Sequence, residues 1–248
     1  MSNISIKKYH QFGNLFNYIK ITLLVSFAAY SMNYAQIQDK NKYNLRVIDT
    51  EQAYKELIQK NSSNNLVDIK KLIPSLKLDI RYAGKNNFLH EQVYNYAKAF
   101  LRLPAAAALK KVQKELQKMG LGLKIFDAYR PYRATVKFYD KVKDTQYVAS
   151  PWSGSRHNRG CAVDLTIISL KTGKELSMPT EFDSFRETAH SDYLNLSSEQ
   201  IKNRDLLIGV MAKYGFENLP TEWWHYDFKD WGKYDIMDLS FEQLEGIK

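Results

Sequence analysis

The residues Ser155 to Thr166 read S-R-H-N-R-G-C-A-V-D-L-T and combine a glycine turn with the start of an alternating apolar pattern. Alternation with a period of two is typical of a β-strand with one face on the core, and the apolar positions are Val163, Leu165 and Ile167. Asp164 then lies on the opposite face of this strand. Gly160 permits a turn that folds His157 back over the strand, so an imidazole and a carboxylate can meet there.

The chain on either side alternates irregularly between expected helices and short strands. Apolar stripes, a proline start, a capping box and terminal glycines predict helices near 104–119, 132–142 and 197–214, and a short helix near 51–59 is also expected. Strands are expected at 76–80, 121–125 and within the aromatic-rich stretch 216–228. Because there is no regular βαβ rhythm, the sequence predicts an α+β fold with a small, largely antiparallel sheet and flanking helices.

The composition is that of an ordinary globular protein. The chain has 248 residues, of which 44% are hydrophobic and 25% charged, enough for one domain with a proper core. The net charge of +9 is scattered, and its densest group lies on one expected helix: Lys110, Lys111, Lys114 and Lys118. Without an aromatic-rich basic stripe, we interpret this group as a solvated helix face and expect no nucleic-acid partner. A basic exterior still favours an anionic cell-wall polymer or membrane surface.

The N-terminal residues 1–35 are predicted to be a signal peptide. Lysines precede an apolar run, Ile21 to Tyr30, of about ten residues, which suits a signal sequence and is too short to span a bilayer. We expect cleavage after Ala35, export to the periplasm or the extracellular space, and no stable membrane span afterwards; an uncleaved anchor is the alternative. Residues 36–65 are polar and are expected to form a tail or linker. The single cysteine, Cys161, excludes a disulfide framework.

A second informative stretch is T-E-W-W-H-Y-D-F, Thr221 to Phe228. If positions 223, 225 and 227 share one strand face, His225 can point into a site, whereas Glu222 is expected in an irregular segment after Pro220. Two imidazoles and one carboxylate suit zinc, and a further carboxylate can act as a general base. Taken singly, each residue also has a structural explanation, since such pairs often serve packing or local hydrogen bonding.

Together these stretches resemble the zinc D-alanyl-D-alanine dipeptidases, which are related to the D,D-carboxypeptidases and the Hedgehog-type fold. The pattern S-x-H-x-x-G-x-A-x-D followed by E-W-W-H is present in full. Further matches are D-I-R-Y-A at 79–83, N-N-F at 86–88, D-A-Y-R-P at 127–131 and F-D at 182–183. The resemblance runs from about Leu66 to Phe228, and Pro179 departs from it because a glycine is expected there.

The resemblance implies a role for each candidate residue. One Zn²⁺ ion per chain would be held by His157, Asp164 and His225. Glu222 would be the base that deprotonates the zinc-bound water and later protonates the leaving amine, and Arg130 would stabilise the oxyanion. Without the family, a structural ion pair with Asp127 would be the preferred interpretation of Arg130. Ser155 and Asp183 match positions that line the substrate pocket, with Asp183 a partner for the free amino group of the substrate. Cys161 occupies a variable position and is not expected to bind zinc.

The resemblance therefore implies a zinc metallopeptidase domain over residues 66–248 that hydrolyses D-Ala-D-Ala or a close D,D-dipeptide in cell-wall metabolism. One alternative is a D,D- or L,D-carboxypeptidase that trims muropeptides. Another is a non-catalytic, zinc-stabilised wall-binding module, against which Glu222 argues, because a structural site has no use for an unliganded base. The sequence does not reveal the oligomeric state.

Overall fold

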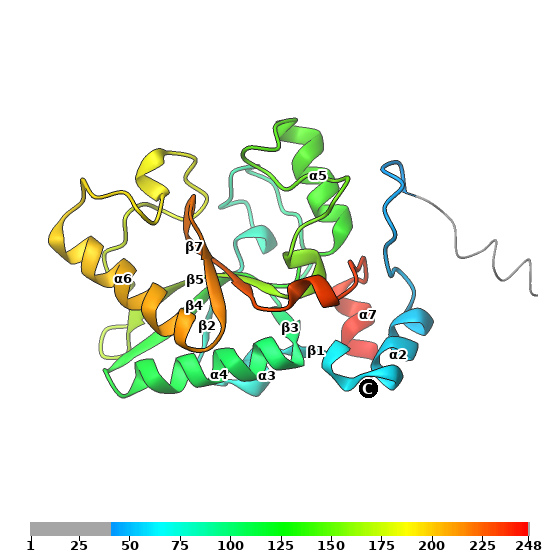
Figure 1. Cartoon of the computed structure of the whole chain (residues 1–248), viewed down its shortest axis with the longest axis horizontal. Helices are drawn as coiled ribbons and strands as arrows, with labels where there is room; N and C mark the ends of the chain where they lie inside the picture. Colours follow the sequence, from blue (N-terminus) through cyan, green and yellow to red (C-terminus); the bar gives the residue numbers. More distant parts are fainter. Residues whose placement is uncertain (1–40, 248) are drawn as a thin grey trace, which may run out of the picture. The chain divides into compact units, whose positions relative to one another are not determined.

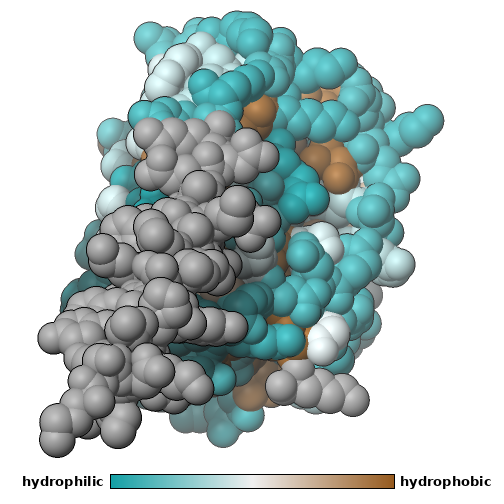
Figure 2. Space-filling model, turned by 90° about the vertical axis from the view of Figure 1, so that its right-hand side faces the viewer, coloured by the Kyte–Doolittle hydropathy of each residue, from teal (hydrophilic) through white to brown (hydrophobic). Residues whose placement is uncertain are grey.

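The computed structural model describes residues 41–247, so the predicted signal peptide, residues 1–35, lies outside the described residues. The chain divides into two units after Asn44, and every element below belongs to the unit that begins at Leu45. None of the helices within residues 41–247 is both long enough and apolar enough to cross a membrane. On the face drawn in Figure 2, most coloured residues are hydrophilic and the apolar ones form small separate patches.

The centre of this unit is a five-stranded mixed sheet with the order β2-β4-β5-β7-β6 (Figure 1). Its strands are β2 (Lys77–Leu78), β4 (Leu121–Asp127), β5 (Ala162–Ser169), β7 (Glu222–Phe228) and β6 (Phe216–Leu219). Only the β2–β4 pair is parallel among the four pairs of this sheet. A second, two-stranded antiparallel sheet pairs β1 (Leu66–Asp68) with β3 (Phe100–Arg102). The predicted α+β class with a largely antiparallel sheet is confirmed.

The helices form where the sequence has helix-start signals and apolar residues at helical spacing. They are α2 (Glu51–Lys60), α3 (Ile69–Leu72), α4 (Leu103–Gln117), α5 (Tyr132–Val142), α6 (Ser198–Lys213) and α7 (Phe241–Gly246). Helix α4 has a proline in its first turn, and the predicted capping box of Ser197 and Gln200 is present at the start of α6. In Figure 1, α4 and α5 lie on opposite sides of the sheet.

The core lies between the sheet and the helices α4 and α6. The buried apolar side chains that meet there come from β5 and from both helices: Val163, Leu165, Ile167, Leu109, Val112, Leu116, Leu207, Val210 and Met211. The alternation in β5 therefore faces the core as predicted. Asp164 lies on the other face, where α5 and the loops build a cavity.

A β-bulge changes the register of the sheet beside Asp164. Ile125 pairs with Leu165, but Asp127 pairs with Asp164, so Phe126 is an extra residue in β4. A bulge inserts one residue and redirects the side chains that follow it. Asp127 consequently stands directly opposite Asp164, and two carboxylates meet at one end of the β4–β5 pair.

Two expectations differ from the structure. The short helix expected near 51–59 is present as α2, but residues 45–65 belong to the folded unit and are not a separate tail or linker. The physical reason is burial: Tyr54 is only 1% exposed, and its hydroxyl accepts a hydrogen bond from the Leu66 amide at 2.6 Å. The strand expected at 76–80 is reduced to β2, because a 3₁₀ helix begins at Arg81.

Candidate metal centre

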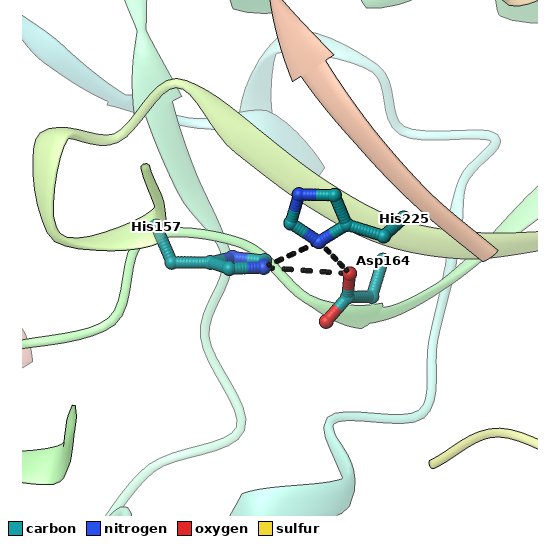
Figure 3. Close-up of side chains that lie close together, drawn as sticks. All are labelled: His157, Asp164 and His225. Atoms are coloured by element: carbon teal, nitrogen blue, oxygen red, sulfur yellow. Dashed lines mark hydrogen bonds and ion pairs between the residues drawn. The ribbon is translucent and has the colours of Figure 1, made fainter. Parts of the chain in front are cut away.

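The side chains of His157, Asp164 and His225 come from separate parts of the chain and lie close together at the wall of the cavity (Figure 3). His157 begins a short 3₁₀ turn before β5, whereas Asp164 and His225 are register partners in the β5–β7 pair. Gly160 ends the turn with φ +68°, and a Cβ there would lie 2.3 Å from Leu66 Cδ2. The backbone conformation therefore favours glycine at this position, and a larger residue would also displace the Leu66 side chain.

The spacing of the three ligand atoms fits a tetrahedral metal ion. His157 Nε2 lies 3.2 Å from His225 Nδ1 and 3.4 Å from Asp164 Oδ1, and His225 Nδ1 lies 3.0 Å from Asp164 Oδ1. Bonds of about 2.0–2.1 Å to a tetrahedral zinc ion place two ligand atoms about 3.3 Å apart. All three residues are buried. The donor set and its spacing therefore suit zinc without rearrangement.

The outer nitrogen of each imidazole has its own acceptor. His157 Nδ1 lies 2.7 Å from the Ala128 carbonyl oxygen, and His225 Nε2 lies 3.0 Å from Asp227 Oδ1. Such acceptors fix the tautomer and the orientation of a metal-binding histidine. Asp227 was absent from the predicted site residues, although its place on the same strand face as His225 was a usable signal.

The charges of the cluster favour a cation. Burial alone would raise the pKa of Asp164, but His157 and His225 more than offset it and hold that pKa well below its usual value. Burial lowers the pKa of His225, whereas its hydrogen bonds to Asp164 and Asp227 raise it to about 10. The two carboxylates beside the imidazoles thus create a negative environment that a divalent cation can neutralise.

Glu222 stands beside the cluster at the start of β7. Its Oε2 lies 3.8 Å from His225 Nδ1, and 33% of its side-chain surface remains open to the cavity. The cavity walls remove enough hydration to raise the pKa of Glu222, while His225 opposes this shift. Glu222 is close to the cluster but is not one of its three residues. A carboxylate with a raised pKa in such a place can act as a general base.

Arg130 connects the cavity to the bulged strand. Its Nε and Nη2 lie 3.0 Å and 2.9 Å from Asp127 Oδ2, so the ion pair considered from the sequence is present. The guanidinium also lies over the rings of Phe138 and Tyr82, with 4.7 Å and 5.3 Å to the ring centroids. Arg130 also lines the cavity, so the same guanidinium can pair with Asp127 and face a bound substrate.

The cavity has a volume of about 690 Å³ and includes the two remaining predicted residues, Ser155 and Asp183. Ser155 Oγ accepts a hydrogen bond from the His157 amide at 3.2 Å. Asp183 has φ +62° and accepts a hydrogen bond from the Tyr82 hydroxyl at 2.9 Å. Burial raises the pKa of Asp183 well above its usual value. An ionised Asp183 therefore favours a cationic partner.

Asn158 was not singled out from the sequence, but it organises the loop that carries His157. Its side chain is buried, and its Nδ2 donates to the Arg130 carbonyl at 2.8 Å and to Thr135 Oγ1 at 2.9 Å. Its Oδ1 accepts from the Ser155 amide at 2.7 Å. The side-chain amide of Asn158 therefore joins the loop that carries His157 to α5 and to the backbone of Arg130.

Cys161 is buried, and burial raises the pKa of its thiol to about 12, which makes it a poor ligand. It is not one of the three clustered residues.

The fold and the site together define a metal-dependent peptidase. The chain belongs to the D-ala-D-ala dipeptidase family: the Peptidase_M15 model with that description matches residues 62–243. The chain is 33% identical to the D-alanyl-D-alanine dipeptidase of Escherichia coli K12, over 73% of this chain and 93% of that protein. It is 27% identical to the enzyme of the same name from Enterococcus faecalis V583, over 67% and 93% of the two chains. The expected family is confirmed.

A solved structure of an LD-carboxypeptidase, LdcB, is also similar to this chain. It has 21% sequence identity and a TM-score of 0.40, and the match covers 74% of this chain and 78% of that one.

Proposed function

We propose that this protein is a zinc-dependent dipeptidase that hydrolyses D-alanyl-D-alanine. The observation that carries the proposal is the meeting of the His157–Asp164–His225 cluster with Glu222 at the wall of one cavity. Relatives that bear the name D-alanyl-D-alanine dipeptidase support the substrate, because the chain spans nine-tenths or more of the length of several of them.

One zinc ion per chain would be held by His157, Asp164 and His225. When bound, zinc polarises the scissile carbonyl and makes a water molecule acidic enough to react near neutral pH. Asp227 and the Ala128 carbonyl accept hydrogen bonds from the outer nitrogens of the two imidazoles, so Nδ1 of His225 and Nε2 of His157 are the nitrogens that would bind zinc.

Glu222 takes the proton of the attacking water and returns it to the leaving amine. Its raised pKa brings the carboxylate closer to the working pH than that of an ordinary glutamate, which assists both proton transfers. Arg130 provides a permanent positive charge for the oxyanion that develops at the scissile carbonyl. Asp127 holds that guanidinium in place through two contacts to its Nε and Nη2.

The substrate amino group is assigned to Asp183. This half-buried carboxylate lines the cavity and has a raised pKa, and an ammonium group bound there would gain both a charge partner and a hydrogen-bond acceptor. A free ammonium group next to the scissile bond is a feature of a dipeptide, and it is absent from that position of a longer peptide. Asp183 therefore favours the dipeptidase over a D,D- or L,D-carboxypeptidase. Ser155 lines the same cavity and is assigned to substrate binding.

We place this activity outside the cytoplasm. The basic, apolar N-terminal sequence resembles a signal peptide over residues 1–35, and the peptidase domain would begin beyond it. Cell fractionation tests this part, and activity found only in the cytosolic fraction would contradict it.

The direct test combines metal analysis of the purified protein with hydrolysis of three substrates. We expect about one zinc ion per chain, rapid hydrolysis of D-Ala-D-Ala, and little release of D-Ala from a pentapeptide that ends in D-Ala-D-Ala. L-Ala-L-Ala is the stereochemical control. Faster release from the pentapeptide would identify a carboxypeptidase, and bound zinc without hydrolysis of either D,D-peptide would indicate a binding module.

A further inference from the structure

The pairing of β6 with β7 contains an irregularity beside the metal cluster. Asn218 of β6 pairs with Tyr226 of β7, but the next residue, Leu219, pairs with Glu222. One step along β6 therefore corresponds to four steps along β7. Residues 223–225 form the extra length, which includes His225, and Glu222 lies at its far end.

This irregularity sets the relation between Glu222 and His225. A regular strand would point residues three positions apart to opposite faces. In the structure, Glu222 Oε2 lies 3.8 Å from His225 Nδ1, and both residues line the same cavity. The departure from a regular ladder is thus what brings the proposed base to the proposed ligand.

One side chain satisfies the backbone groups at this irregularity. Asn218 Nδ2 donates to the Glu222 carbonyl at 3.0 Å and to the His225 carbonyl at 2.9 Å, and it lies 3.5 Å from the Trp223 carbonyl. Because every one of these neighbours is a carbonyl oxygen, the nitrogen of the amide must face them. Backbone carbonyls that leave a ladder need another donor.

We propose that Asn218 is a positioning residue that fixes Glu222 relative to His225. The inference rests on the proposed function, because it assigns Glu222 and His225 their roles in hydrolysis. Asn218 is not among the residues that line the cavity in the described part of the chain, so it acts through the backbone of β7. It lies in the edge strand of the sheet, and its side chain bridges the two ends of the extra length of β7.

The chemistry of the amide explains why this position needs asparagine. Its two N–H groups match the two close carbonyls, at Glu222 and His225. Aspartate has nearly the same shape but only acceptors, so its carboxylate would face carbonyl oxygens. Glutamine keeps both donors but moves them by one methylene group.

The test compares Asn218→Asp with Asn218→Gln and with Asn195→Asp, which makes the first chemical change at an exposed position. The measurements are kcat and KM for D-Ala-D-Ala, zinc affinity by competition with a chelator, and the visible spectrum of the cobalt-substituted protein. For Asn218→Asp we expect kcat to fall by about 10–100-fold with little change in KM, weaker zinc binding and an altered cobalt spectrum. Asn195→Asp should match the wild type in all of these.

Asn218→Gln is the second variant, and it is the informative one if Asn218→Asp does not fold. We expect Asn218→Gln to keep its circular dichroism spectrum but to show an altered cobalt spectrum and a lower kcat. Wild-type kcat, zinc affinity and cobalt spectrum in a folded Asn218 variant would overturn the inference. A wild-type protein that fails to hydrolyse D-Ala-D-Ala, alongside an Asn218 variant with an altered cobalt spectrum, would contradict the proposed function and leave the positioning role supported.

Discussion

Asp164 and His225 are register partners in the β5–β7 pair, and Asp164 Oδ1 lies 3.0 Å from His225 Nδ1. Their separation is set by the backbone hydrogen-bond ladder between two neighbouring interior strands of the sheet. His157 reaches the same point from a turn outside the strands. Two of the candidate ligands are therefore fixed by the sheet, and the third depends on a loop held by Asn158.

His157→Ala should abolish stable zinc binding while the sheet remains intact, because two ligands rarely retain the ion when the third is lost. Metal content after dialysis, measured together with circular dichroism, tests this expectation. His190→Ala is the matched control, since His190 lines the cavity but is not part of the cluster. Equal zinc content in the wild type and His157→Ala would remove His157 from the ligand set.

Glu222→Gln should retain zinc and lose activity. The amide preserves the size of the side chain but cannot accept a proton, so we expect kcat for D-Ala-D-Ala to fall by about 10²–10⁴-fold. Glu187→Gln makes the same change at another residue of the cavity wall and should have little effect. A Glu222→Gln enzyme with near wild-type kcat would exclude Glu222 as the base.

Arg130→Lys should reduce both activity and stability. Lysine keeps the charge but replaces the planar fork that meets Asp127 through Nε and Nη2. We expect kcat to fall by about 10²–10³-fold, as for loss of one oxyanion donor, and the melting temperature to fall because Asp127 is buried. If melting temperature falls but kcat does not, the arginine serves only the ion pair.

Asp183→Asn should stabilise the fold and weaken substrate binding. The pKa of Asp183 is raised in the folded protein, so its contribution to stability is present below the usual aspartate pKa and is lost as pH rises through the folded value. Asparagine carries no such penalty and tolerates the positive φ at this position. We therefore expect the free energy of unfolding of the variant to exceed that of the wild type increasingly as pH rises.

Denaturant titrations across the acid-to-neutral range test the stability of Asp183→Asn, and KM for D-Ala-D-Ala tests binding. We expect KM to rise with a smaller change in kcat, because the lost contact is to the substrate amino group. A stability difference that does not vary with pH, or an unchanged KM, would contradict the assignment.

Local patterns in the sequence were sufficient for the strand β5, the helices α4, α5 and α6, and the pairing of a glycine turn with Asp164. Local patterns also indicate His157 and His225 as candidate metal-binding residues. This success has a simple origin: side-chain alternation, helix caps and glycine turns depend on neighbours within a few residues. The family resemblance then indicated that the two separated stretches belong to one site.

The folded structure was needed for the relations that depend on pairing between distant strands. The bulge at Phe126 sets Asp127 opposite Asp164, and the irregular β6–β7 register brings Glu222 to His225 with Asn218 as its donor. A one-residue change of register carries no local signature, because it arises from the competition of whole strands for backbone hydrogen bonds and burial. The place of residues 45–65 in the folded unit also depends on a distant contact. Their sequence is mostly polar, and the buried hydrogen bond between Tyr54 and Leu66 has no local sequence signal.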